Sequence, residues 1–374
     1  MSYVAKCLLV ELLSRDRAVQ SFSLKEWDLI IRQARATKLL GSLGAYIGEG
    51  NAGKAIPIKA LNHIQSVSRQ AGRTKISSQY EIEQIGKITE KLNYPVIVLK
   101  GAAYVLREYS SSIGRLFSDI DILVPKKQIY DLERRFLDNG WYGEKQHPYD
   151  QKYYRQWMHE LPPLTNSRTG STLDLHHNIL PETASIKVNV DLMIVSIIPV
   201  DGFHNIYTLS PVDMVLHSLT HLFHEGEFDH GLRDLLDVHR LVISFCEEDD
   251  QFWMHLLKRS FQLSLSLPLL YGVRYLILFL KTDIPSFVVE ELQAKYGSEH
   301  KVMDFLFVRA LMPNHKSCDD KFSGFARWCL YVRSHHLRMP AYLLIPHLLR
   351  KAYMKRKERN ESTSEIDVDG KNGN

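Results

Sequence analysis

Cysteine and long apolar runs are both scarce in this chain. Its four cysteines are scattered, at Cys7, Cys246, Cys318 and Cys329, and form no C-x-x-C pair. This spacing argues against a cysteine zinc site or a disulfide framework, and predicts reduced thiols in a cytoplasmic protein. No apolar stretch of roughly 18 residues is free of charge, and the first residues carry too short an apolar run for a secretory signal. We therefore expect neither a transmembrane helix nor a leader.

A strong net charge is also missing. The formal charge is +4 over 374 residues. Because no platform of interleaved aromatic and basic residues is apparent either, nucleic acid is not expected as a partner or acceptor. Hydrophobic residues make up 45% and charged residues 24% of the chain, as in ordinary globular proteins, and the length allows two or three domains.

Helical patterns dominate both ends of the chain. Ser23 and Glu26 form a capping-box pattern that opens a helix through Ala36, and a long helix is expected over residues 58–92. Ser210, followed by proline, begins a second helical region. The expected organisation is an N-terminal helical region over 1–90, a sheet-containing core over 91–205, a C-terminal helical domain over 206–356 and a disordered tail over 357–374.

Short runs of β-branched and apolar residues in the core predict strands and hence an α+β fold. The run at residues 94–99 reads as a buried strand that passes through Lys100-Gly101 into a helix over 102–109. Further strands are expected over residues 119–124, 141–142, 153–164 and 171–179. An amphipathic helix is expected over 126–139, with Ile129, Leu132, Phe136 and Leu137 facing inward.

Two aspartates stand two residues apart in the strand expected over residues 119–124. Because side chains alternate along a strand, Asp119 and Asp121 point to the same face. In the strand over 171–179, Asp174 shares a face with His176 in the same way. If the two strands are neighbours, three carboxylates converge and can hold two Mg²⁺ ions, with Mn²⁺ as an alternative. The competing interpretation places Asp119 and Asp121 on a solvated strand face or in a turn, and Asp174 on the surface of an edge strand.

Three stretches together resemble a known family. They are Val98-Leu-Lys-Gly101, Arg115-Leu-Phe-Ser-Asp119-Ile-Asp121-Ile-Leu-Val124 and Leu173-Asp174-Leu-His176. The combination is similar to the uncharacterised bacterial nucleotidyltransferase family of the DNA polymerase β-like superfamily. The resemblance covers about residues 90–245 well, and the flanking helices more loosely. It implies a mixed sheet with helices on one side, a nucleoside triphosphate donor such as ATP, and magnesium.

The phosphate-binding part of this resemblance is incomplete. Better-known superfamily members have a Gly-Ser pair before the first aspartate, whereas Gly101 is followed by alanine here. The expected nucleotide-binding residues are Lys100, Gly101, Arg115 and Ser118. Gly101 allows the backbone to approach phosphates, or it is a plain turn residue. Arg115 either contacts phosphate or pairs with one of the aspartates, and Ser118 is otherwise a local hydrogen-bonding residue.

Histidines recur on one face of the helix after Ser210. His217, His221 and His224 have helical spacing, but Ser218 stands where a zincin motif requires glutamate, which argues against zinc. The resemblance implies that this region forms a lid or a wall of the acceptor site. The candidates are His176, His221, Arg233 and Asp237. The alternative is that such buried polar residues only tie helices together.

These patterns predict a metal-dependent enzyme that moves a nucleoside monophosphate from a nucleoside triphosphate to a hydroxyl acceptor and releases pyrophosphate. The acceptor is a small molecule, a glycan or a protein side chain; the last defines a protein-modifying nucleotidyltransferase. A non-catalytic nucleotide-binding module is the other alternative. The apolar and then basic segment after Arg338 is expected either to associate weakly with an anionic membrane surface or to dock as a terminal helix.

Overall fold

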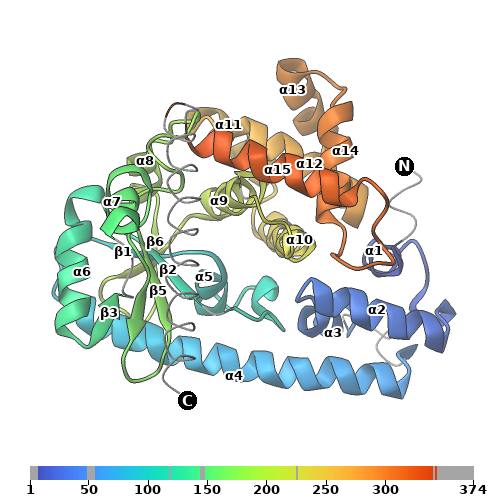
Figure 1. Cartoon of the computed structure of the whole chain (residues 1–374), viewed down its shortest axis with the longest axis horizontal. Helices are drawn as coiled ribbons and strands as arrows, with labels where there is room; N and C mark the ends of the chain where they lie inside the picture. The colour runs from blue at the N-terminus through green and yellow to red at the C-terminus, as the bar shows by residue number, and fades with distance from the viewer. Residues whose placement is uncertain are drawn as a thin grey trace, which may run out of the picture.

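A mixed β-sheet at one side of the molecule carries the candidate site (Figure 1). The computed structural model describes residues 7–48, 55–117, 119–143, 148–224, 226–339 and 342. Within these ranges seven strands form one sheet in the order β3-β4-β5-β2-β1-β7-β6. The strands are β1 (Val96–Val98), β2 (Asp119–Leu123), β3 (Trp141–Gly143), β4 (Leu164–Asn166), β5 (Thr172–His176), β6 (Ile198–Pro199) and β7 (Ile206–Thr208). The predicted α+β fold with a mixed sheet is confirmed.

The sheet is mixed because two of its pairings are parallel. Strand β2 runs parallel to β5, and β1 runs parallel to β7, whereas the other neighbours are antiparallel. In the central pair, Ile120 lies beside Leu173 and Ile122 beside Leu175, and all four side chains are buried. Since side chains alternate along a strand, this apolar row leaves the residues between them on the opposite face.

The N-terminal helices extend away from the sheet along one long helix (Figure 1). The elements are α1 (Leu8–Leu13), α2 (Leu24–Ala36), α3 (Leu40–Gly48) and α4 (Ile58–Thr89). The predicted capping box is present at the start of α2, where Glu26 N donates to Ser23 Oγ and Ser23 N donates to the Glu26 carboxylate. Helix α4 contacts α2 and α3 toward its N-terminus and α5 farther along, and its Glu81 accepts from Asn166 Nδ2 of β4 at 3.1 Å, so it joins the two parts.

Helices also follow the strands inside the core. They are α5 (Lys100–Leu106), α6 (Ile129–Asp138), α7 (Pro148–Trp157) and α8 (Val190–Ile194). Helix α6 buries Ile129, Leu132 and Phe136 as predicted, and the Phe136 ring packs edge-on against Trp141 at 5.5 Å. The prediction that Leu137 faces inward is wrong, because its side chain is 46% exposed at the end of the helix.

The strand predicted over residues 153–164 is the clearest error. Helix α7 occupies residues up to Trp157, and β4 begins only at Leu164. Tyr153 and Trp157 lie one helical turn apart with their rings in contact at 5.7 Å, and Arg155 pairs with Glu133 of α6 at 2.9 Å. Aromatic side chains have a strand preference on average, but here their contacts within and between helices decide the structure.

The C-terminal helices pack beside one another. They are α9 (Pro211–His224), α10 (Gly231–Glu248), α11 (Phe252–Gln262), α12 (Ser266–Leu280), α13 (Ser286–Tyr296), α14 (Lys301–Leu311) and α15 (Ser323–Arg338). Helices α9 and α10 face the carboxylates of the sheet across a cavity. The predicted Ser210 cap is observed, since its Oγ accepts from Asp213 N. None of the helices in the described part of the chain is both long and apolar enough to cross a membrane.

Some predictions concern residues that the structure does not describe, and one concerns a domain boundary. Ser118, the tail over 357–374 and nearly all of the basic segment after Met339 lie outside the described residues. Strand β7 ends at Thr208, so the sheet extends past the core boundary predicted at residue 205.

Candidate active site

Three carboxylates meet on the face of the sheet opposite the apolar row. Strands β2 and β5 run side by side, and Asp121 stands directly beside Asp174 in their register. Asp119 lies two residues before Asp121 on the same face. The carboxylate oxygens of all three lie within 4.8 Å of one another. The geometry therefore brings together the three residues that the sequence identified as metal ligands.

Asp121 is buried and held in its charged form. Its Oδ1 accepts hydrogen bonds from Lys100 Nζ at 2.9 Å and from His176 Nε2 at 3.0 Å. Burial alone raises the pKa of Asp121, but the charge of Lys100 and the bond from His176 outweigh it and hold this pKa well below its usual value. The same ion pair keeps Lys100 protonated, because the charge of Asp121 raises the pKa of Lys100 against the opposing effect of burial.

Asp174 is in the opposite situation. Its Oδ1 is buried and has no hydrogen-bond partner among the described residues. Burial, and then the nearby charge of Asp121, raise the pKa of Asp174 to about 7. A buried carboxylate oxygen without a partner is costly. A divalent cation between Asp174 and its two neighbours would remove that cost, and a set of carboxylate oxygens fits Mg²⁺ or Mn²⁺.

The turn between β1 and α5 brings Lys100 to this group. Leu99 N donates to Asp121 O at 2.9 Å, which fixes the end of β1 beside β2. Lys100 adopts φ +46°, a left-handed conformation that is uncommon for a residue with a Cβ. Gly101 follows, and a Cβ there would lie 3.3 Å from Arg115 Nη1. Glycine therefore allows the guanidinium of Arg115 to approach the backbone closely.

Arg115 is buried and pairs with the helical domain. Its Nε donates to Asp237 Oδ2 at 2.8 Å, and its Nη2 lies 3.6 Å from Asp234 Oδ1. The predicted pairing with Asp119 or Asp121 is thus replaced by an ion pair with α10. The loop before Arg115 is fixed by Gly114, which has φ +76° and packs so closely on Gly41 of α3 that a Cβ would meet its backbone at 2.3 Å.

A cavity of about 210 Å³ lies between the carboxylates and helices α9 and α10. Its lining includes three of the four residues predicted for an acceptor wall, namely His221, Arg233 and Asp237, as well as Lys100, Gly101 and Arg115. His176 does not line it. This side chain is 3% exposed and lies behind Asp121. Four basic side chains, those of Lys38, Lys100, Arg115 and Arg233, make the cavity suited to an anionic ligand.

A second cavity, of about 240 Å³, lies on the other side of Asp119. One wall is the polar face of α4, with Gln70, Arg73, Thr74, Ser77 and Ser78. The other is formed by the starts of β2 and β5. Asp119 and Phe117 line both cavities. The carboxylates therefore stand where two ligands can approach from different directions.

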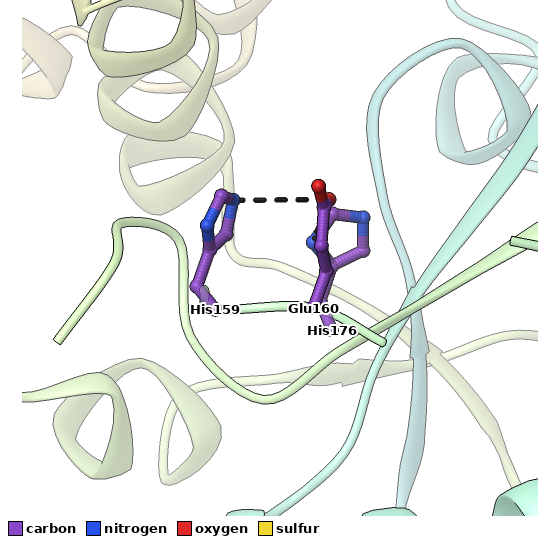
Figure 2. A group of neighbouring side chains, drawn as sticks. All are labelled: His159, Glu160 and His176. Atoms are coloured by element: carbon purple, nitrogen blue, oxygen red, sulfur yellow. Dashed lines mark ion pairs between the residues drawn. The ribbon is translucent and has the colours of Figure 1, made fainter. Parts of the chain in front are cut away.

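Sequence reasoning missed several residues around the site. His159 and Glu160 lie beside His176, in the segment wrongly predicted as a strand, and Figure 2 shows their side chains. The adjacent His-Glu pair was the available signal. Tyr104, whose Oη lies 2.7 Å from Ser218 Oγ, lines the first cavity and had no sequence signal of its own. His217 and His224 are buried in α9, and in the described structure they belong to no group with metal-ligand spacing.

The site lies within a span that matches a known protein family. A family model described as uncharacterised nucleotidyltransferase matches residues 23–281. The matched span contains the whole sheet, the three carboxylates and helices α9 to α11. No curated protein matches the chain.

Proposed function

Since the chain belongs to the uncharacterised nucleotidyltransferase family, we propose that it transfers a nucleoside monophosphate from a nucleoside triphosphate to a hydroxyl acceptor. The new bond joins the acceptor oxygen to the α-phosphorus. The bond from that phosphorus to the bridging oxygen breaks, and pyrophosphate leaves. The observation that carries this proposal is the register that pairs Asp121 with Asp174, beside Asp119, on two parallel strands.

Asp119, Asp121 and Asp174 would hold two divalent ions, with Mg²⁺ favoured and Mn²⁺ as the alternative. When bound, such ions neutralise phosphate charge and lower the pKa of the acceptor hydroxyl. Lys100 orients Asp121 through its bond at 2.9 Å. Asp174 would contact the ion on the acceptor side or take the proton of the acceptor hydroxyl. The remaining work of the site is positioning and charge stabilisation.

The two cavities support a division between donor and acceptor. The cavity with Lys38, Lys100, Arg115 and Arg233 would take the triphosphate, because its basic groups complement phosphate charge. The cavity along α4 is lined mainly by hydroxyl and amide side chains, which suit a hydroxyl-bearing acceptor. Asp119 lines both, as a group at the point of transfer must.

The test is transfer of label from triphosphates labelled at the α-phosphorus, with Mg²⁺ and a lysate as the source of acceptors. Asp119→Asn should lower transfer by about 100-fold or more, since metal stabilisation of the transition state is worth several kcal/mol. Asp138→Asn is the matched control, because Asp138 is an exposed aspartate at the end of α6. Equal transfer by wild type and Asp119→Asn would refute the proposal.

The same experiment separates the alternatives. Nucleotide binding by wild type with no release of pyrophosphate would identify a non-catalytic nucleotide-binding module. Label recovered in protein would identify a protein-modifying nucleotidyltransferase, and label in a small molecule or a glycan would identify the other acceptor classes.

A further inference from the structure

A second group of ligating side chains lies behind the carboxylates. His159, Glu160 and His176 each offer one atom, and these atoms lie within 4.8 Å of one another. Glu160 Oε2 is 3.4 Å from His176 Nδ1 and 4.0 Å from His159 Nε2. Figure 2 shows the His159 ring facing the Glu160 carboxylate, with His176 beside it. The set differs from the aspartates, because two of its three ligands are imidazole nitrogens.

The backbone holds the three residues in place. Glu160 forms an antiparallel bridge with His176. On either side of the bridge, Leu161 N donates to Leu175 O at 2.8 Å and His177 N donates to His159 O at 2.8 Å. The segment after α7 is thus fastened to the end of β5, and the three side chains are positioned before any ligand arrives.

The hydrogen bond between His176 and Asp121 determines which nitrogen of His176 is available. Nε2 of His176 lies 3.0 Å from Asp121 Oδ1, which also accepts from Lys100 Nζ at 2.9 Å, so the ring donates there through Nε2–H. Its other nitrogen, Nδ1, faces Glu160 Oε2 at 3.4 Å. A ring proton or a cation can join these two atoms.

His159 indicates which cation this is. A proton shared by His176 and Glu160 would satisfy those two groups but would leave His159 without a role. Burial holds the pKa of His159 well below its usual value, so the ring is neutral and can donate a lone pair. The nitrogen that faces the group is Nε2, 4.0 Å from Glu160 Oε2, whereas the buried Nδ1 lies on the other side of the ring. A metal ion between the three side chains would engage all of them.

The distances fit a tetrahedral ion. Ligands at roughly 2.0–2.1 Å from Zn²⁺ are about 3.3 Å from one another. The Nδ1–Oε2 separation of 3.4 Å already has this value, and His159 Nε2, 4.0 Å from Glu160 Oε2, would move closer on binding. The side chains of His159 and Glu160 are 17% and 24% exposed, so the group is not sealed from solvent.

We propose that His159, Glu160 and His176 bind one Zn²⁺ ion, separate from the ions held by the aspartates. His176 would link the two sites, with Nδ1 on zinc and Nε2–H donating to Asp121. Hydrogen bonds of this kind between a ligating histidine and a carboxylate fix the orientation of both groups. The zinc is therefore a positioning site for Asp121, and the residues given above as catalytic do not change.

The test is metal content without nucleotide. Wild-type protein is incubated with excess Zn²⁺, desalted and analysed by inductively coupled plasma mass spectrometry. We expect one zinc per chain in wild type and in Asp119→Asn, which removes a ligand of the aspartate site only. His159→Ala and the isosteric Glu160→Gln should lose it. Circular dichroism checks the fold of each variant, and Co²⁺ in place of zinc should give visible absorption bands typical of tetrahedral nitrogen and oxygen ligation.

Two results would overturn the proposal. One is wild-type protein that retains no zinc after desalting. The other is zinc that disappears in Asp119→Asn but stays in Glu160→Gln, because the ion would then occupy the aspartate site. Since neither measurement uses a nucleotide, failure of the zinc site leaves nucleotidyl transfer untouched, and failure of transfer leaves the zinc site untouched.

Discussion

Replacing Asp174 with asparagine should stabilise the protein in the absence of metal, and more so at high pH than at low pH. The pKa of this carboxyl rises from 3.8 to about 7 on folding, because burial and then the charge of Asp121 disfavour ionisation. Between these two pH values the folded protein keeps a proton that the unfolded chain has released. The free energy of unfolding therefore falls as the pH rises from the unfolded pKa to the folded pKa. Above the folded pKa, the buried charge of Asp174 destabilises the protein by its full amount.

The size of the effect follows from the shift. Ionisation of Asp174 lowers the free energy of unfolding by at most about 2 kcal/mol near pH 5 and about 4 kcal/mol near pH 8, at 1.36 kcal/mol per pKa unit. Asparagine keeps the shape of the side chain and cannot ionise. Burying the amide changes the free energy of unfolding by the same amount at both pH values. The effect of the substitution should therefore differ by about 2 kcal/mol between pH 5 and pH 8, and this difference comes from the charge of Asp174 alone.

The assay is urea denaturation of wild type and Asp174→Asn in EDTA at the two pH values. The gain is the free energy of unfolding of Asp174→Asn minus that of wild type, and we expect it to grow by about 2 kcal/mol from pH 5 to pH 8. Adding Mg²⁺ should stabilise wild type more than the variant and so reduce the gain. A gain that is the same at both pH values would refute the reasoning, because Asp174 would then have an ordinary pKa.

Three further predictions concern other contacts of the fold. Arg115→Ala leaves the buried Asp237 carboxylate without its partner at 2.8 Å and should lower the free energy of unfolding by about 3–5 kcal/mol, against a smaller loss for Arg115→Lys in the same urea assay. Cys7 and Cys318 have sulfur atoms 3.4 Å apart, so mild oxidation should yield their disulfide-linked peptide in mass spectrometry, and recovery of both thiols would contradict this geometry. Gly272→Ala places a Cβ 2.6 Å from a leucine methyl of α9 and should cost about 1–3 kcal/mol in thermal unfolding; an unchanged melting temperature would contradict that packing.

Local patterns in the sequence predict the two strands that carry the three aspartates. The alternation of apolar and acidic residues predicts the strand that carries Asp119 and Asp121, and the same alternation places Asp174 with His176. Proline and glycine mark some element ends, such as Pro211 at the start of α9 and Gly140 after α6, whereas Gly41 and Gly44 lie inside α3. The sequence does not predict that β2 and β5 are neighbours, because no local pattern states which strands are adjacent. The structure supplies that register.

Contacts between distant segments account for what the sequence could not reveal. Arg115 finds Asp237 at a separation of 122 residues, and nothing near Arg115 indicates a helical partner. His159 and Glu160 were hidden because the aromatic segment before them has strand propensity, whereas its ring contacts favour helix α7. Their meeting with His176 depends on the bridge that fastens this segment to β5.

The position of the label in the transferred group tests the central claim most directly. Purified protein is incubated with Mg²⁺, a lysate and triphosphates labelled either at the α-phosphorus or at the γ-phosphorus. We predict that the α-label is transferred and the γ-label is released in pyrophosphate, and that Asp119→Asn loses this transfer while Asp138→Asn keeps it. Transfer of the γ-label instead, or transfer of the α-label that is the same with Asp119→Asn, would contradict the account.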